Sequence, residues 1–442
     1  MEIVMSILAK SVLIISNSDK TDDELSEALY TKGYLPHEIN LDRFSELDLS
    51  TIPPKAIILK ADINNDHVQT HLRDIKSLYA EFNIPILALI DTQNHTTPLS
   101  DAAMLCDSVL LAPHHPMQIV LRTMGLIRLT VMEQEINLRM QTLQEDFEFT
   151  PELITPNTDE RFRILFIGKA SPEFMIIINA LQRENVNISA AFTSFTAFDY
   201  LYEQTFDAVV MNGLKGIEPA YSVTQTMRKN AKLYHVPALL LVDTETFDDH
   251  ELIYEAGIND IIDAKSALDD IRGRILEQAN FHQTHTALKN EFVALGDSTC
   301  IDELTQLYNR AFFNAHLPRV TRFYESQGLP ISLCLIRVRT QEIDISRQQS
   351  DMIYKQLGSM IKNLVRLHDI TARLDDNLFA IAFPGQSKEE LRPVSERISS
   401  ILKITSLSDQ ETGRPLKVEL DITFSELDGK DTAGNKQSAA LI

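Results

Sequence analysis

The chain has 442 residues, of which 44% are hydrophobic and 24% are charged, and its formal net charge is −22 at pH 7. This length and composition suit packed cores in about three ordinary domains and argue against a mainly disordered chain. The acidic balance argues against wrapping nucleic acid or docking on an anionic membrane, because both need a clustered basic surface.

The cysteines and the N-terminal residues predict a cytoplasmic protein. Cys106, Cys300 and Cys334 are far apart and have no Cys-x-x-Cys spacing, so neither a disulfide framework nor a zinc cluster is expected. The apolar run from Ile3 to Leu8 is too short to span a membrane and lacks the basic leader and cleavage site of a secretory signal. We therefore expect no membrane span.

Short apolar runs separated by amphipathic stretches recur over the first two thirds of the chain. Runs of this length are typical of buried parallel strands, and strands that alternate with helices predict doubly wound α/β domains. One set of runs is followed by a second set at corresponding intervals, which indicates a tandem duplication. The runs are Ser11–Ile15, Ala56–Leu59, Pro85–Ile90 and Ser108–Leu111, then Arg163–Ile167, Asp207–Met211, Pro237–Val242 and Asp260–Ile262.

Each repeat resembles the receiver domain of response regulators, which has a flavodoxin-like (CheY-like) doubly wound fold. The resemblance is clearest at residues 256–262, Ala-Gly-Ile-Asn-Asp-Ile-Ile, which are similar to the family's Gly-Ala-x-Asp-Tyr segment before the last strand. We expect receiver domains at residues 1–144 and 162–280. The linker between them, residues 145–161, carries two prolines and several acids.

A helix is expected to follow the second repeat and to lead into a signalling linker at residues 281–299. Apolar residues along it form a partial heptad seam, which belongs either to the last receiver helix or to a helix that pairs in a dimer. His282 and His285 are expected to be polar seam positions, because a metal site needs further ligands. The seam residues are Leu268, Ile271, Ile275, Leu288, Phe292 and Leu295.

Residues 302–310 read Asp-Glu-Leu-Thr-Gln-Leu-Tyr-Asn-Arg. This segment resembles the opening motif Asp-x-Leu-Thr-Gly-Leu-Tyr-Asn-Arg of the GGDEF family of cyclic di-GMP synthases, with Gln306 in place of the glycine. The resemblance implies an α+β GGDEF domain, a nucleotide cyclase-like fold, at residues 300–442. The motifs of the family's last helix have no match in residues 425–442.

The hairpin signature of the family, Gly-Gly-(Asp/Glu)-Glu-Phe, is degenerate in this chain. Asp375 and Asp376 replace the two glycines, and Asn377 replaces the metal-binding acid. Leu378 replaces the following Glu, and only Phe379 is kept. The resemblance therefore implies a cyclase domain that has lost its catalytic residues.

Two further sets of catalytic positions are altered. The strand that ends Asp-x-Asp in active cyclases carries Arg337 and Arg339, whose charges would repel a divalent metal. The phosphoacceptor positions of the two receivers fall on Lys60, or Ala61, and on Asn212, and none of these can form an acyl phosphate. We therefore expect a protein that is not an enzyme and that has no metal and no cofactor.

One ligand-binding motif is kept. Arg366 and Asp369 have the family's Arg-x-x-Asp spacing, and the helical periodicity before them predicts an exposed position at a helix end. An Arg can donate to guanine O6 and N7, and a carboxylate can accept from guanine N1 and N2. The resemblance implies that this pair binds cyclic di-GMP, assisted by Arg373 and Arg397. The alternative is an exposed i, i+3 ion pair.

The order receiver, receiver, GGDEF resembles a class of response regulators and their non-catalytic paralogues. It implies a cyclic di-GMP effector that contacts other proteins of a signalling or proteolysis pathway, in cell-cycle or polarity control and with recruitment to a cell pole. We also expect a homodimer through the receiver face formed by the fourth and fifth helices. Two alternatives stay open, namely an active diguanylate cyclase and a ligand-free dimeric scaffold.

Overall fold

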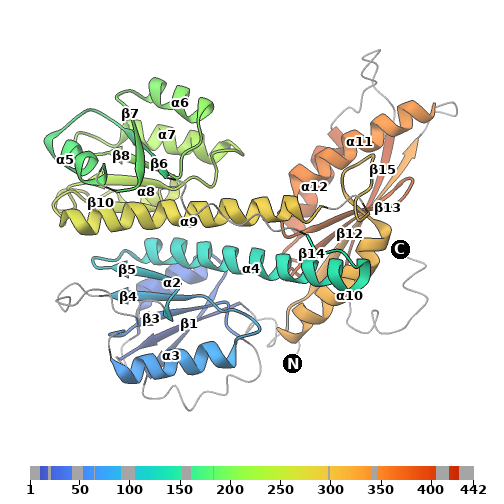
Figure 1. Ribbon diagram of the computed structural model, residues 1–442, viewed down its shortest axis with the longest axis horizontal. Helices are drawn as coiled ribbons and strands as arrows, with labels where there is room; N and C mark the ends of the chain where they lie inside the picture. The colour runs from blue at the N-terminus through green and yellow to red at the C-terminus, as the bar shows by residue number, and fades with distance from the viewer. Residues whose placement is uncertain are drawn as a thin grey trace.

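The computed structural model describes residues 10–17, 21–41, 53–63, 65–90, 105–151, 161–182, 184–296, 299–340, 346–404 and 418–427. These residues form three five-stranded sheets with helices packed on them. Figure 1 shows the first two sheets on opposite sides of a pair of long helices, and the third sheet at one end of this pair.

The first sheet is parallel and has the strand order β2-β1-β3-β4-β5. Its central strands are buried, as expected for continuous runs of Val, Ile and Leu that are covered on both faces. The strands are β1 (Ser11–Ser16), β2 (Leu35–Asn40), β3 (Ala56–Lys60), β4 (Ile86–Ile90) and β5 (Ser108–Leu111), and the helices beside them include α2 (Asp23–Thr31) and α3 (Asp66–Leu78).

The second sheet repeats this topology in the order β10-β9-β8-β6-β7. Numbered from its own first strand, each sheet has the order 2-1-3-4-5, which is the flavodoxin-like order. The prediction of two doubly wound units is therefore confirmed at the level of topology, and we call them the first and the second receiver-like domain after the resemblance of their sequences. The elements are β6 (Phe162–Ile167), α5 (Pro172–Leu181), β7 (Val186–Ala191), α6 (Ser194–Glu203), β8 (Ala208–Asn212), α7 (Glu218–Lys229), β9 (Ala238–Val242), α8 (His250–Glu255) and β10 (Asp260–Asp263).

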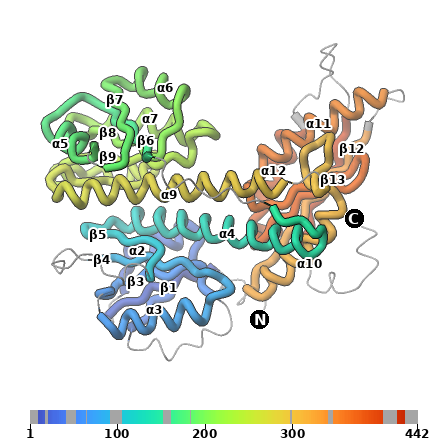
Figure 2. The backbone as a smooth tube through the Cα atoms, in the orientation of Figure 1, coloured from blue at the N-terminus to red at the C-terminus, as the bar shows by residue number. Residues whose placement is uncertain are grey.

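Two long helices, α4 (Pro116–Phe147) and α9 (Leu268–Ala294), run side by side along the centre of the molecule. Each begins after the last strand of its sheet and then extends toward the third sheet, as the tube in Figure 2 shows. α4 continues past residue 144, so the first residues of the predicted linker at 145–161 are helical. The predicted border at residue 144 therefore falls inside a helix.

The seam on α9 is filled by α4 of the same chain. Leu288 and Phe292 of α9 share one hydrophobic core with Met132 and Ile136 of α4. The interpretation as a continuing last helix of the second receiver-like domain is observed, and the pairing of this helix in a dimer stays a prediction. The apolar seam residues in this part of α9 already have their partner inside the chain.

The two histidines of α9 make polar and ring contacts with the second receiver-like domain. His282 Nδ1 lies 3.5 Å from Asp207 Oδ1, and the His285 ring lies 4.4 Å from the ring of His235. Burial, followed by the charge of Arg128, lowers the pKa of His285 to about 4, so this ring is neutral at physiological pH.

The receiver face that was expected to form a homodimer is used inside the chain. Gln118 of α4 donates a hydrogen bond of 2.6 Å to Asp260 of β10, and the His115 ring stacks on Tyr254 of α8 at 5.0 Å. The α8–β10–α9 face of the second receiver-like domain is thus covered by the last helix of the first one. A homodimer through this face would have to displace α4.

The third sheet is mixed and has the order β11-β13-β14-β12-β15. Its apolar side chains pack in two layers, one against α10 and α4 and the other against α11 and α12. This is the α+β arrangement that was expected. The elements are β11 (Tyr308–Asn309), α10 (Arg310–Ser326), β12 (Ile331–Thr340), α11 (Arg347–Leu364), β13 (Ile370–Asp375), β14 (Leu378–Pro384), α12 (Arg392–Ile404) and β15 (Val418–Leu427), and residues 428–442 lie outside the described residues.

Candidate functional site

The Arg-x-x-Asp residues form a closed turn between α11 and β13, which we call the RxxD turn (Arg366–Asp369). The Asp369 backbone N–H donates to the Arg366 carbonyl at 3.1 Å, and Asp369 Oδ2 accepts from the Arg366 N–H at 2.7 Å. The spacing of three residues is what allows the carboxylate to reach back to the first N–H, as Asp does in turns. The motif therefore has a defined conformation without a ligand.

Two arginine side chains lie at this turn and at the helix end just before it. The Arg366 side chain is exposed, and Arg397 of α12 donates from Nη2 to the carbonyl of Leu364 at 3.1 Å, at the C-terminal end of α11. A cation is favoured at that end because the last helical carbonyls carry partial negative charge. Arg397 thus lies at the end of α11 that leads into the RxxD turn, and its part in binding a ligand together with Arg366 and Asp369 stays a prediction.

The predicted exposure of Asp369 is wrong, because its side chain is only 6% exposed. The RxxD turn packs against α4, where Arg139 donates to the carbonyls of Leu367 at 3.3 Å and of Asp369 at 3.2 Å. The alternative of an exposed Arg366–Asp369 ion pair is also wrong, since the carboxylate bonds to backbone and lies inside.

Burial changes the titration of the turn. It raises the pKa of Asp369 to about 7, although the backbone N–H and the positive charge of Arg366 both oppose this rise. Asp369 Oδ1 accepts no hydrogen bond from any residue that the structure describes. Burial, followed by the charge of Arg366, lowers the pKa of His368 to about 4, so His368 is neutral near pH 7.

Arg373 makes its contacts with the hairpin and the opening motif. Its guanidinium donates to Asp302 Oδ2 at 3.2 Å and to the Asp376 carbonyl at 2.9 Å, and it lies over the Tyr354 ring at 4.9 Å. A strand rises about 3.3 Å per residue, so the Arg373 backbone is roughly 13 Å from that of Asp369. In this structure the side chain joins the hairpin to the opening motif, and its assistance to the Arg366–Asp369 pair stays a prediction.

Asn377 lies in the hairpin between β13 and β14, at the position where the family resemblance expects a metal-binding acid. Asn377 donates from Nδ2 to the carbonyl of Val338 at 3.2 Å, and Asp375 and Asp376 are exposed at the tip. Leu378 and Phe379 are buried in β14.

The neighbouring strand β12 presents cations at this place. Arg337 and Arg339 are exposed, and Arg339 pairs with Asp421 of β15 at 2.6 Å. Within the described ranges, no group of three or more His, Cys, Asp or Glu is arranged to hold a metal ion.

The phosphoacceptor positions of the receiver-like domains are occupied by local interactions. Lys60, at the end of β3, forms an ion pair with Asp22, the N-cap residue of α2. Asn212, at the end of β8, donates to the Lys169 carbonyl at 2.7 Å and accepts from the Leu214 N–H at 3.1 Å. The Lys60–Asp22 pair was not foreseen, because the partners are 38 residues apart in the sequence.

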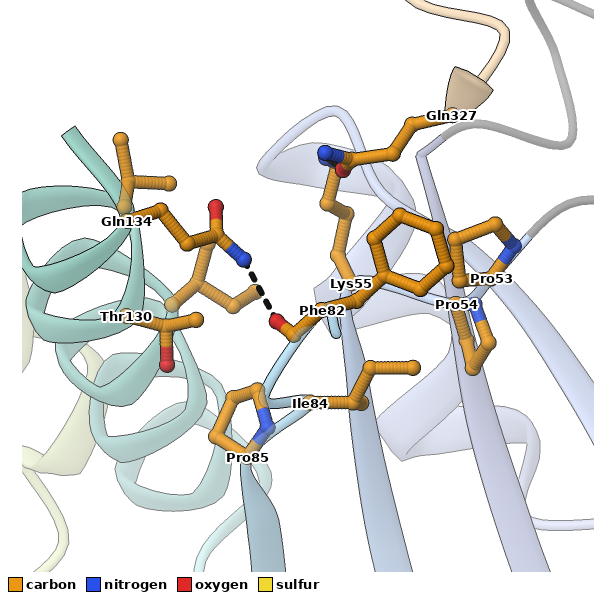
Figure 3. A pocket seen from close by; sticks show the side chains of 11 residues that line it. Pro53, Pro54, Lys55, Phe82, Ile84, Pro85, Thr130, Gln134 and Gln327 are labelled. Atoms are coloured by element: carbon orange, nitrogen blue, oxygen red, sulfur yellow. Dashed lines mark hydrogen bonds between the residues drawn. The ribbon is translucent and has the colours of Figure 1, made fainter. Parts of the chain in front are cut away.

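A small cavity lies where the first receiver-like domain meets α4 and the residue after α10 (Figure 3). Gln134 donates to the Phe82 carbonyl at 2.5 Å on one side, and Lys55 donates to Gln327 at 3.1 Å on the other. Its volume of about 20 Å³ is enough for roughly one water molecule and not for a nucleotide. The Lys55–Gln327 bond ties the first receiver-like domain to the third domain.

Residues 299–440 match the family described as "Diguanylate cyclase, GGDEF domain". The response regulator PleD of Caulobacter vibrioides is 20% identical over 195 residues, which are 43% of this chain and 43% of that protein. The chain thus spans less than half the length of this relative.

Two solved structures represent the two kinds of domain. The GGDEF domain of DgcB from Caulobacter crescentus, in complex with c-di-GMP, has 22% identity and a TM-score of 0.28, over 30% of this chain and 81% of that one. The receiver domain of the sensor histidine kinase PA1611 from Pseudomonas aeruginosa has 18% identity and a TM-score of 0.25, over 27% of this chain and 98% of that one. Among the described helices, none is both long and apolar enough to cross a membrane.

Proposed function

With a GGDEF domain at residues 299–440 as the premise, we propose that this protein binds cyclic di-GMP at the RxxD turn without synthesising it. The observation that carries the proposal is the meeting of Arg366, Asp369 and Arg397 at one end of α11, where one buried carboxylate oxygen lacks a donor among the described residues. A buried carboxylate oxygen without a donor is costly and is suited to a ligand N–H.

The chemistry of the turn matches a guanine base and a phosphate. Arg366 can donate to guanine O6 and N7 as a fork, and Asp369 can accept from N1 and N2 once its side chain faces outward. Arg397 is exposed beside them and supplies a second cation for a phosphate of the ligand. In this proposal Arg366 and Asp369 recognise the guanine base on two of its edges, and Arg397 neutralises part of the negative charge of the ligand.

The proposed lack of synthesis follows from the charges at the hairpin. Arg337 and Arg339 take the metal-facing positions on β12, and Asn377 takes the position of the acid. A guanidinium about 4 Å from a divalent ion is repelled by roughly 8 kcal/mol at an effective dielectric constant of 20. This energy disfavours the metal ions on which the cyclase reaction depends.

The receiver-like domains are proposed to act through contacts and not through phosphorylation. The Lys60 ammonium fills one acceptor position with positive charge, and the Asn212 amide fills the other and cannot form an acyl phosphate. In this proposal the protein is an effector or adaptor whose ligand-dependent surfaces contact proteins of a signalling or proteolysis pathway.

Calorimetric titration of the full chain with cyclic di-GMP tests the proposal. Arg366→Ala removes a bidentate, charge-assisted contact and should weaken binding by about 30- to 150-fold. Arg392→Ala is the matched control, because Arg392 is an exposed arginine on the same helix as Arg397 and pairs with the neighbouring Glu396. The proposal is rejected if wild type and the folded Arg366→Ala variant bind equally well, or if wild type shows no binding at micromolar ligand. The ligand-free scaffold is then the remaining alternative.

A further inference from the structure

Charged and polar side chains are buried where α4 packs on the third domain. Glu135 and Arg139 of α4 are 0% and 4% exposed, and His316 of α10 is 0% exposed. Arg139 Nε donates to Glu135 Oε1 at 2.7 Å, and His316 Nε2 lies 3.0 Å from the same oxygen. We call Glu135, Arg139 and His316 the α4 cluster.

The α4 cluster holds one buried ion pair. Burial opposes charge on Glu135, but Arg139 and His316 outweigh it and lower the pKa of this carboxylate. Burial lowers the pKa of His316, so the ring is neutral. A buried ion pair contributes little net stability compared with an apolar core of the same volume, which raises the question of what else it does.

Arg139 also reaches beyond the α4 cluster. From Nη2 it donates hydrogen bonds to the carbonyl of Leu367 at 3.3 Å and to that of Asp369 at 3.2 Å. One guanidinium group therefore bonds the RxxD turn at two carbonyl groups. Its guanidinium carbon lies 4.7 Å from the centre of the Phe292 ring of α9. One side chain therefore connects both long helices to the RxxD turn.

We propose that Arg139 is a positioning residue that holds the RxxD turn closed, with Asp369 inside, and that loosening this contact from α4 increases the affinity for cyclic di-GMP. This inference rests on the proposed function. It assigns to α4, which begins in the first receiver-like domain, control over a ligand site in the third domain.

Loosening Arg139 is expected to increase the affinity for cyclic di-GMP, because Arg139 bonds the RxxD turn in its closed state and the ligand needs the open state. In the closed turn, Arg139 binds two carbonyls while the Asp369 carboxylate accepts the Arg366 N–H. A guanine base can reach the carboxylate only when that side chain turns outward, which moves the peptide groups that Arg139 holds. Interactions made only in the closed state oppose a ligand that binds the open state.

The test uses Arg139→Lys in the full chain. The guanidinium bonds Glu135 through Nε and the two carbonyls of the turn through Nη2, whereas a lysine has a single ammonium nitrogen and cannot bond Glu135 and the turn at these two places at once. Amide exchange of residues 367–370, measured without ligand, should become about tenfold faster, the effect of losing one charge-assisted hydrogen bond. The affinity for cyclic di-GMP should rise about fivefold or more.

Arg319→Lys is the matched control. Arg319 of α10 pairs with Glu145 and Asp146 of α4 at 2.8 and 3.2 Å, so it joins α4 to the third domain, as Arg139 does, but through ion pairs with α4 and not through the RxxD turn. This variant should leave both the exchange of the turn and the affinity unchanged. A merely structural role of Arg139 would reduce stability but would not tighten ligand binding.

The outcomes separate the two proposals. Unchanged exchange of the turn in Arg139→Lys overturns the role of Arg139, whether or not any ligand binds. Faster exchange with unchanged or weaker affinity overturns the coupling. If wild type binds no cyclic di-GMP, the proposed function fails, while the exchange experiment still decides whether Arg139 holds the turn.

If Arg139→Lys does not fold, a measurement on the wild-type protein can still refute the inference. Binding of cyclic di-GMP should speed the amide exchange of α4 around Arg139, since opening the turn breaks the contacts of that side chain. Saturating ligand that leaves this part of α4 unchanged would overturn the coupling.

Discussion

Asp369 should make the local stability of the third domain depend on pH near neutrality. Burial raises its pKa from 3.8 to about 7, against the opposing effect of Arg366. The folded state keeps a proton that the unfolded chain releases above pH 3.8, so stability from this group is complete below that pH and is lost as the pH rises through 7. One pKa unit corresponds to about 1.36 kcal/mol, so the full loss is at most about 4 kcal/mol.

Other groups around Asp369 must be separated from it. Arg366 and Arg139 remain cationic, and the lowered pKa of Glu135 keeps that carboxylate charged. His368 acts in the opposite direction, because its pKa is lowered to about 4 and its contribution grows as the pH rises from 4 to 6.5. The comparison that isolates Asp369 is therefore wild type against Asp369→Asn, which has nearly the same shape and does not titrate.

The assay is amide exchange of β13, which follows the RxxD turn directly, at about pH 5.5 and about pH 8 after correction for intrinsic rates. Between these two pH values the opening free energy of wild type should fall relative to Asp369→Asn by about 2 kcal/mol, because only about 1.5 pH units separate pH 5.5 from the folded-state pKa of about 7. At the higher pH the Asp369→Asn variant should be the better protected protein. An equal pH dependence in the two proteins would refute the buried, proton-holding carboxyl group.

Three further outcomes are expected. Gln306→Gly should stabilise the protein by about 1 kcal/mol, because Gln306 has φ 58° in the left-handed region where a side chain is unfavourable, and the melting temperature should rise. GTP with Mg²⁺ or Mn²⁺ should yield no cyclic di-GMP by chromatography, because Arg337 and Asn377 replace the metal-binding acids; product from a preparation free of other cyclases would contradict this. Acetyl phosphate should add no phosphoryl group to either receiver-like domain by intact mass, because Lys60 and Asn212 hold the acceptor positions.

The strand order and the family of the third domain could be predicted because their sequence patterns are local. Buried parallel strands leave continuous apolar runs, and two sets of such runs predicted two sheets with the same topology. The motif at residues 302–310 is likewise contiguous, and residues 299–440 match the family that it indicated. Arg397, which the resemblance named, bonds to the carbonyl of Leu364 two residues before the RxxD turn, and its role in ligand binding stays a prediction.

The burial of Asp369 and the partner of Arg373 could not be predicted, because both depend on segments distant in sequence. Arg139 is 230 residues from Asp369, and Asp302 is 71 residues from Arg373. The length of α4 was obscured for a related reason, since Glu135 and Arg139 interrupt its apolar face although both are buried. Charged residues on a buried helix face resemble solvent-exposed positions until their partners are known.

Because the RxxD turn depends on α4, the affinity measured for cyclic di-GMP should differ between the full chain and a fragment that lacks α4. A fragment of residues 300–442 would contain Arg366, Asp369 and Arg397 but would lack Arg139, which holds the turn, as well as Leu138 and Leu143, which pack in the same core as the third sheet. Its turn would be free to open, and the apolar surface that α4 covers would face water. Such a fragment should bind cyclic di-GMP more tightly than the full chain if Arg139 opposes binding, so the two affinities measure different states of one site.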